Sequence, residues 1–498
     1  MTPSKAFSTR YSAAKQWRDA MRASIEEVYR FCAPDRERDF STRSKTIVES
    51  ETYHSLGEEC ASDLAGDLVT YFTPSYASWF NGVVTSDVPE DLEDEVLELV
   101  TEREETLRTM ISASNYNDVA PQVSFETASH GTPGMWVDKG HLAQPMYVEV
   151  VPPNELLLTP GYMGILDRFR EKTVCAEHLT ALFAGLPVTL DDRLRVKMQK
   201  PGSLCVVCWG FWVDWADPGR PMWRWEITVD GKRVTEENML LGDLAGSCPL
   251  LVGRFNPRPG RPWGRGAGLR ALRDLRVLDK IEESVLIGLE DALKTTLIYP
   301  GDAMIDFSDG IVAGRAYAAG RHFDRNSVYE LNKTTNLEVG FFSEESLERR
   351  IRAHFYQDGP RQRGDTPPTA AQWFDEARRI QEKLGKPSAP LWTELYLPFV
   401  QRVEYLGITG GLLQQAIMLQ GQAVSVQLES PLQKAQNRDQ VMIARSNLQL
   451  AVETMQERAG ETVNFVETFK NITKASGDKL TVIHKEQQQI EPAQPPAG

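Results

Sequence analysis

The sequence has no long apolar segment and few cysteines. No run approaches the roughly 18 consecutive apolar residues that a membrane-spanning helix needs, and residues 1–17 lack the apolar stretch of a signal peptide. Six cysteines in 498 residues do not supply a disulfide framework for a chain of this size. We therefore expect a soluble protein that stays in the reducing compartment where it is made.

Motifs of common catalytic sites are also absent. There is no His-Glu-x-x-His and no Gly-x-Ser-x-Gly, and the seven histidines are scattered. Cys205 and Cys208 form one Cys-x-x-Cys, but no second pair of ligands completes a zinc site, and in a strand the two side chains point to opposite faces. The glycines of residues 262–269 (PWGRGAGL) lack the Gly-Lys-Ser/Thr of a phosphate-binding loop. We predict no catalytic residues, no cofactor, no metal, and a protein that is not an enzyme.

One enzymatic alternative stays open. Glu126 and Asp138 lie near His130 in the sequence, and carboxylates beside a histidine can perform acid/base chemistry in a metal-dependent hydrolase. Such a hydrolase needs a pocket that brings the three residues together. Their spacing matches no catalytic motif.

Acidic residues outnumber basic ones, 70 to 55, which gives a net charge of -15. Affinity for phosphates comes mainly from Lys and Arg that displace counterions, so this balance argues against a protein that clamps nucleic acid tightly. Two interpretations remain. The charge provides solubility, or it belongs to a conduit through which DNA slides without adhering.

Helical periodicity dominates the N-terminal third. Apolar residues recur at helical spacing from Trp17 to Val28, from Tyr53 to Tyr71 and from Leu92 to Leu107. Pro34 and Pro74 end the first two patterns. We expect three amphipathic helices that bury their apolar stripes.

A β-rich region follows from Met135 to Val252. Alternating segments, a break at Pro152-Pro153 and tight turns at the sequences DPGR and DGK predict an antiparallel meander. The region also holds five of the eleven tryptophans: Trp209, Trp212, Trp215, Trp223 and Trp225. Such a density of tryptophan is typical of a thick core or of a buried subunit contact, and both remain possible.

Two long helices separated by an insert follow the β-rich region. The first is expected from Gly268 to Lys294 and the second from Ser343 to Asp358. A polar helix is expected from Gly411 to about Lys474, with a stripe at Val441, Ala444, Leu448 and Val452. A long helix, a small insert and a returning helix are more typical of a spacer than of a catalytic pocket.

A basic loop of residues 359–368 (GPRQRGDTPP) comes after the second of these helices. Its prolines and glycines keep it out of the flanking helices. Arg361 and Arg363, on either side of Gln362, offer phosphate contacts that do not depend on base sequence. The alternative is an ordinary exposed connector whose arginines only make it soluble.

Five segments, taken in order, resemble the head-to-tail connector, or portal protein, of short-tailed T7-like bacteriophages. The resemblance covers about residues 10 to 450, and the collinear order makes it more specific than any one segment. The segments are DLAGDLVTYFTPSYASWF (63–80), RPWGRGAGLRALRDLRVLDKIEESVL (261–286), TPPTAAQWFDEARRIQEKLG (366–385), LWTELYLPFVQRVEYL (391–406) and SPLQKAQNRDQ (430–440).

The resemblance implies a dodecameric ring at one vertex of the capsid, through which double-stranded DNA is packaged and later ejected. It implies five partners: further copies of the chain, the terminase large subunit, a tail adaptor protein, and the major capsid and scaffolding proteins. It implies assembly in the host cytoplasm and a place in the virion between capsid and tail, with no membrane. It also implies that Arg361, Gln362 and Arg363 form a DNA-channel loop. Another oligomeric virion protein, such as a minor head or tail adaptor, is the alternative, although a simpler adaptor would not need the two long helices and the insert.

The implied fold class is α+β, with a mainly helical wing that carries the antiparallel β region, a two-helix stem, a small α/β clip and a helical C-terminal crown. The expected divisions are a wing at 1–265, a first stem helix at 266–296, a clip at 297–342, a second stem helix at 343–358, the channel loop at 359–368, wing helices at 369–410, the crown at 411–477 and a disordered tail at 478–498.

Overall fold

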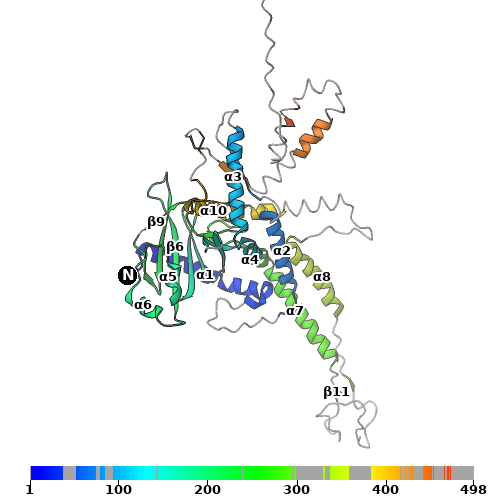
Figure 1. Ribbon diagram of the computed structural model, residues 1–498. Helices are drawn as coiled ribbons and strands as arrows, with labels where there is room; N and C mark the ends of the chain where they lie inside the picture. Colours follow the sequence, from blue (N-terminus) through cyan, green and yellow to red (C-terminus); the bar gives the residue numbers. More distant parts are fainter. Residues whose placement is uncertain are drawn as a thin grey trace, which may run out of the picture. The chain divides into compact units, whose positions relative to one another are not determined.

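A computed structural model of the chain shows a mixture of helices and antiparallel sheets (Figure 1). It divides into two compact units: unit 1 comprises Met1–Thr70 and Leu107–Leu413, and unit 2 comprises Tyr71–Thr106 and Gln414–Gly498. None of the described helices combines the length and the hydropathy needed to cross a bilayer. The structure describes residues 2–36, 52–74, 79–84, 93–141, 144–237, 239–293, 297–298, 329–330, 337–357, 383–414, 418–419, 422–423, 426–429 and 441–450, together with positions 453, 465, 468, 469 and 472.

The N-terminal helices follow the predicted apolar stripes. The side chain of Ser4 caps the start of α1 (Lys5–Cys32) by accepting a hydrogen bond from the backbone N–H of Phe7 at 3.1 Å. The chain then makes a short turn of 3₁₀-helix at η1 (Pro34–Arg36). The other helices of this region are α2 (Leu56–Phe72), α3 (Glu93–Ser112) and α4 (Tyr116–Ser129). All three predicted amphipathic helices are confirmed.

The β-rich region forms two antiparallel sheets rather than one. The larger sheet contains β4 (Leu156–Pro160), β5 (Leu166–Cys175), β6 (Leu204–Asp214), β7 (Met222–Val229) and β8 (Lys232–Arg233) in that order, and β9 (Met239–Asp243) also pairs with β7. The smaller sheet has the order β10 (Leu250–Val252), β2 (Gly134–Lys139), β3 (Met146–Val151). The meander is therefore confirmed for β4 to β8. The chain passes between the sheets at Pro152-Pro153, where neither residue has a backbone N–H to continue a ladder.

Both predicted tight turns are present in the larger sheet. The backbone N–H of Arg220 donates to the carbonyl of Asp217 at 3.1 Å, which closes the turn before β7. Asp230 and Gly231 have φ values of 47° and 76°, the left-handed pair that a two-residue hairpin requires. Two short helices, α5 (Leu179–Leu182) and α6 (Asp192–Met198), are inserted between β5 and β6.

Apolar side chains are buried on both faces of the larger sheet. On one face, residues of the smaller sheet and the C-terminal half of α1 complete a core that contains Trp209, Trp223 and Trp225. On the other face, Phe7 and Ala14 of α1 pack with Trp212. These four tryptophans are between 3% and 6% exposed, and Trp215 packs against the first core, so the core interpretation of the tryptophans is confirmed. Cys205 belongs to the first core and Cys208 to the second, on opposite faces of β6 as predicted.

A contact between backbones fixes the start of the longest helix after the sheets, α7 (Ala267–Leu293). The N–H of Gly266 donates to the carbonyl of His130 at 3.1 Å, and the N–H of Phe255 donates to the carbonyl of Gly131 at 2.9 Å. Gly131 has a φ of +88°, and a Cβ there would lie 2.6 Å from the carbonyl carbon of Arg265. On Gly266 a Cβ would lie 2.5 Å from the carbonyl oxygen of Ser129. The glycines before α7 thus allow two segments to touch.

A buried carboxylate joins α1, η1 and α4. Glu126 is 2% exposed and accepts hydrogen bonds from the hydroxyl of Tyr29 at 2.7 Å and from Nε2 of His130 at 2.8 Å. It also forms an ion pair with Arg36. Burial alone would raise the pKa of Glu126, but the hydrogen bond and charge of His130 and the charge of Arg36 prevail and lower this pKa to about 2.

The returning helix differs in its bounds from the prediction. It is α8 (Leu337–His354), so it begins before Ser343, within the predicted clip. The glycine at position 340 does not stop the helix, since one glycine inside a helix costs only about 1 kcal/mol relative to alanine. Between the two helices, β11 (Leu297–Ile298) pairs antiparallel with β12 (Tyr329–Glu330).

The helix after the predicted channel loop is described from residue 383 on. Residues 383–391 are helical and lead through one π-helical stretch, η4 (Trp392–Tyr396), into α10 (Leu397–Thr409). Pro398 lies at the start of α10, where its missing N–H is accommodated beside the wider π turn. The part of the predicted helix before Lys383 lies outside the described residues.

Unit 2 contains strands where a continuous polar helix was predicted from Gly411 onward. That prediction is wrong for β13 (Met418–Leu419), β14 (Gln422–Ala423) and β15 (Val426–Glu429). β15 pairs antiparallel with β1 (Asn81–Val84), a partner far away in the sequence that no local pattern identifies. Residues 441–450 are helical, and Val441, Ala444 and Leu448 form their less exposed stripe as predicted. The predicted tail at 478–498 lies outside the described residues.

The glycine contact before α7 predicts a large difference between two alanine substitutions. Gly185 has a φ of +78° but open space around it, so Gly185→Ala should cost about 1 to 2 kcal/mol of unfolding free energy through backbone strain alone. Gly131→Ala adds a steric clash to the same strain and should cost about 1 to 3 kcal/mol more. Urea denaturation of both variants measures the difference. Equal losses of stability would show that the contact is unimportant.

The depressed pKa of Glu126 predicts acid sensitivity that a substitution removes. A carboxylate with a folded-state pKa of about 2, against an ordinary value of 4.5, stabilises the protein above pH 4.5, and this stabilisation is lost as the pH falls toward 2. Its size is on the order of 3 kcal/mol. We expect Glu126→Gln to be less stable than the parent at pH 7 and to lose less stability than the parent between pH 4.5 and 2. Urea midpoints across this range test the expectation, and parallel pH profiles would contradict it.

Candidate functional site

The predicted DNA-channel residues Arg361, Gln362 and Arg363 lie outside the described residues. The structure does describe both ends of the segment that contains them. One end is the C-terminus of α8, and the other is residues 383–387. The candidate site consists of the elements that hold these two ends.

α7 and α8 pack side by side in opposite directions (Figure 1). Asp274 of α7 forms an ion pair with Arg350 of α8 at 3.1 Å and a hydrogen bond with Nε2 of His354 at 3.2 Å. Leu347 and Ile351 of α8 are buried. The more distal part of α7 is less covered, since Leu286, Ile287 and Leu289 are 48%, 55% and 42% exposed.

A tyrosine in the left-handed region ends α8. Tyr356 has a φ of 63°, and the N–H of Gln357 donates to the carbonyl of Arg352 at 2.9 Å, as in a Schellman cap. Glycine usually occupies this position. Here the guanidinium of Arg270 donates to the Tyr356 hydroxyl at 2.5 Å and lies 5.4 Å from the centre of its ring. These contacts to α7 hold the strained residue in place, and with it the start of the segment that contains the predicted loop.

A basic cleft opens between the two ends of that segment. It has a volume of about 750 Å³. Arginine and lysine predominate in its lining, and none of the described lining residues is acidic. The lining residues are Asn256, Arg258, Arg265, Arg270, Ala353, His354, Tyr356, Lys383, Lys386 and Pro387.

The arginines of the cleft repel one another. Partial burial, followed by the charges of Arg258, Arg270 and Arg273, lowers the pKa of Arg265. The positive end of the α7 dipole adds to this field, and the first turn of α7 has no acidic residue to offset it. The cleft can therefore bind a group of negative charge.

Sequence reasoning did not find this cleft. Its residues come from three separate segments, which lie before and within α7, at the end of α8 and at residues 383–387. The only local signal was the density of arginine from Arg254 to Arg276. That signal does not show that Lys386 faces the same space.

The structure does not support the hydrolase alternative. Glu126 and His130 are in contact, but only 2% and 1% of them is exposed. The carboxylate of Glu126 already bonds to Tyr29, Arg36 and His130. Asp138 instead forms an ion pair with Arg402 at 3.3 Å. The hypothesis that these three residues form one catalytic pocket is wrong.

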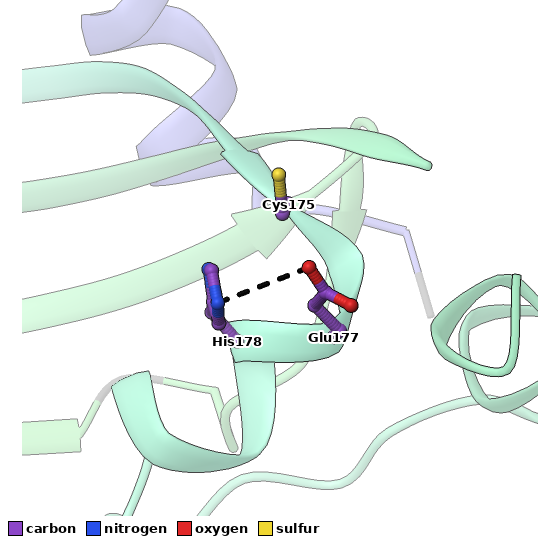
Figure 2. Close-up of side chains that lie close together, drawn as sticks. All are labelled: Cys175, Glu177 and His178. Carbon is purple, nitrogen blue, oxygen red and sulfur yellow. Dashed lines mark ion pairs between the residues drawn. The ribbon is translucent and has the colours of Figure 1, made fainter. Parts of the chain in front are cut away.

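Cys175, Glu177 and His178 form a small group of metal-ligand types beside β5 (Figure 2). Their ligand atoms lie within 4.8 Å of one another, and Oε1 of Glu177 lies 3.9 Å from Nε2 of His178. The two side chains are 49% and 71% exposed. Structural zinc sites use four ligands in a closed shell, whereas the described residues bring only three together in an open turn. This group alone does not form such a site.

Comparisons with known proteins identify a family. The family described as "Bacteriophage head to tail connecting protein" matches residues 4–482. Among solved structures, a chain from the virion of a native gene transfer agent particle gives a TM-score of 0.42 at 10% identity, covering 90% of this chain and 92% of that one. A chain from the neck of an empty gene transfer agent particle gives 0.40 at 11% identity, covering 84% and 90%. No curated protein matches the sequence.

The assignment of the chain to a family rests on the family match alone, which spans nearly the whole sequence. It also agrees with the resemblance in the five collinear segments, although it does not address their likeness to T7-like phages in particular. The chain belongs to the family of bacteriophage head-to-tail connecting proteins, which are structural proteins of the virion and not enzymes.

Proposed function

We propose that the chain forms a ring at one vertex of the capsid, a portal through which double-stranded DNA is packaged and ejected. The family match over residues 4–482 is the observation that carries this proposal. A protein that connects the head to the tail lies in the path of the genome. A closed ring joins the two and leaves that path open.

Exposed apolar residues on α7 support contacts between copies. Leu286, Ile287 and Leu289 lie close together in the sequence on the less covered part of this helix. Large apolar side chains gathered on a surface favour association with another protein. A heterologous contact that closes on itself gives a ring, and we propose twelve copies.

The loop of residues 359–368 is proposed to face the channel. Arg361 and Arg363 would contact phosphates without reading sequence, and Gln362 lies between them. Two arginines from each copy are few enough for the duplex to move, because a densely basic wall would hold the phosphates tightly. The net charge of -15 is consistent with such a conduit.

The insert between α7 and α8 is proposed as the docking end. Packaging DNA is energetically uphill, and the sequence has no phosphate-binding loop, so the energy must come from a partner ATPase. We assign the terminase large subunit to residues 297–342, followed by a tail adaptor on the same surface. α7 has 27 residues and spans about 40 Å, which holds this end away from the sheets.

The other proposed divisions follow the sequence analysis. The wing, residues 1–265 and 369–410, would contact the capsid and scaffolding proteins. Residues 266–296 and 343–358 would form the stem, and 411–477 the crown. The protein would assemble in the host cytoplasm and remain in the virion of a short-tailed phage.

The ring predicts a particle much larger than the 56.0 kDa chain. Size-exclusion chromatography with light scattering should give a mass close to twelve chains, and negative-stain images of the peak should show closed rings with a central hole. A monomer that also fails to assemble when scaffolding protein is added would contradict the proposal.

The channel loop predicts a separable defect in DNA handling. Arg361→Ala combined with Arg363→Ala should leave ring assembly intact and reduce the packaged length or the retention of DNA. The slope of log affinity for duplex DNA against log salt should fall by about 1 for each phosphate that the variant no longer binds. Arg193→Ala with Lys200→Ala removes the same charge from exposed positions on and beside α6 and is the control. Unchanged packaging and retention in the loop variant would refute the role of the arginines.

A further inference from the structure

The basic cleft contains cations that have no counter-ion in the described part of the chain. Arg258 and Lys386 are exposed, and neither forms an ion pair with a described carboxylate. The nearest carboxylate in the α7–α8 pair, Asp274, is already engaged by Arg350 and His354. At the start of α7, Arg258 and Lys386 therefore carry positive charge that no described carboxylate pairs.

A second uncompensated group lies further along the same two helices. Glu282 of α7 faces Glu344 and Glu348 of α8, and we call these three residues the acidic cluster. Partial burial, followed by the charges of Glu344, Glu348 and Asp279, raises the pKa of Glu282. Within the described residues, no lysine, arginine or histidine forms an ion pair with any member of the cluster. The described part of the chain thus carries two groups of opposite sign without ion pairs in it: Arg258 with Lys386, and the acidic cluster.

These two surfaces cannot neutralise each other within one chain. At about 1.5 Å per residue, the 12 positions from Arg270 to Glu282 separate them by about 18 Å along α7. The ion pair and hydrogen bond of Asp274 with α8 and the contact of Arg270 with Tyr356 hold the two helices in register. Among the described residues, opposite charges therefore do not meet between these two surfaces.

Carboxylates of a protein suit this cleft better than the phosphates of a sliding duplex. A ring would repeat the arginines and lysines of the cleft in every copy, and so many cations on a channel wall would hold the DNA backbone tightly. A permanent contact between subunits has no such conflict. The acidic cluster is a partner of the required charge that every copy already carries.

We propose that the basic cleft of one copy binds the acidic cluster Glu282, Glu344 and Glu348 of a neighbouring copy. This inference depends on the ring of the proposed function. The contact joins two different surfaces, so it is heterologous and propagates from each copy to the next. Rotation about a ring axis relates neighbours without any translation along it. Two surfaces about 18 Å apart along α7 can therefore touch only if α7 is inclined to the ring axis so far that both lie at nearly the same height.

Charge reversal on each side tests the contact. The cleft variant is Arg258→Glu with Lys386→Glu, and the cluster variant is Glu344→Lys with Glu348→Lys. Sedimentation velocity measures the fraction of each protein in rings, under conditions where the wild-type chain forms them. Each variant alone should form at least about tenfold less ring, because its two reversed charges then repel the surface that the native residues attract. Arg193→Glu with Lys200→Glu makes the same change of charge as the cleft variant on and beside α6 and should assemble normally.

The decisive sample is an equimolar mixture of the two variants. We expect the two variants to alternate around the ring. At one contact, the unchanged acidic cluster of the cleft variant faces the unchanged cleft of the cluster variant. At the next contact, the reversed cleft faces the reversed cluster. At every contact the substituted residues then face substituted residues of opposite charge, or two unchanged surfaces face each other, so rings should form again. Rescue in the mixture also shows that both variants are folded. Higher salt should weaken these contacts as the Debye length falls from about 10 Å at 0.1 M to about 3 Å at 1 M.

Three results would overturn the inference. Variants that assemble as well as the wild type show that the contact does not exist, and variants that fail alone and in the mixture show that the two surfaces are not partners. A cleft variant that assembles normally but binds a short DNA duplex more weakly shows that the cleft takes phosphates instead. In these cases the wild-type rings remain and the proposed function stands, whereas a wild-type chain that forms no rings refutes the proposed function itself.

Discussion

The contact between the backbone at Gly131 and the segment that precedes α7 determines where the rest of unit 1 lies. It requires glycine on both sides, because a Cβ on Gly131 or on Gly266 would overlap a backbone atom of the other segment. The start of α7 is thereby fixed to the end of α4, beside the buried ion pair of Glu126. α8 follows through its ion pair with α7, and Tyr356 follows through Arg270. The position of the basic cleft is a consequence of this series of contacts.

Charges are used in two different ways in the chain. Inside unit 1 they are paired: Glu126 has three partners, and the guanidinium of Arg402 bonds to the carbonyls of Val137, Gly246 and Ser247. Such groups are buried, and pairing offsets the cost of removing them from water. Along α7 and α8, which also belong to unit 1, ion pairs such as that of Arg350 with Asp274 lie beside two groups of like charge. Groups that form no ion pair among the described residues add little to the stability of that part of the chain, and the proposed contact with a neighbouring copy would pair them.

Local sequence patterns correctly predicted the structural features that depend on residues close together in the sequence. The stripes of α1 and α2, the hairpin at Asp230 and Gly231, and the opposite directions of Cys205 and Cys208 depend on residues a few positions apart. Contacts between distant segments were not predictable in this way. The separation of the β-rich region into two sheets, the pairing of β1 with β15, and the cleft each depend on segments that meet only in the folded chain. The end of α8 was misplaced because a tyrosine, supported by Arg270, replaces the expected glycine. The channel loop remains a prediction.

The length of α7 has a mechanical consequence. Its first turns are held among buried residues such as Ala267, Ala271 and Leu275, while Leu286, Ile287 and Leu289 toward its other end are exposed. A helix anchored at one end transmits a rotation as a lever does. Over the about 40 Å of α7, a turn of about 5° at its anchored end moves its far end by about 3.5 Å. Small rearrangements around Gly131 are therefore magnified at the far end of α7, and a force applied to that end acts on the glycine contact with the same mechanical advantage.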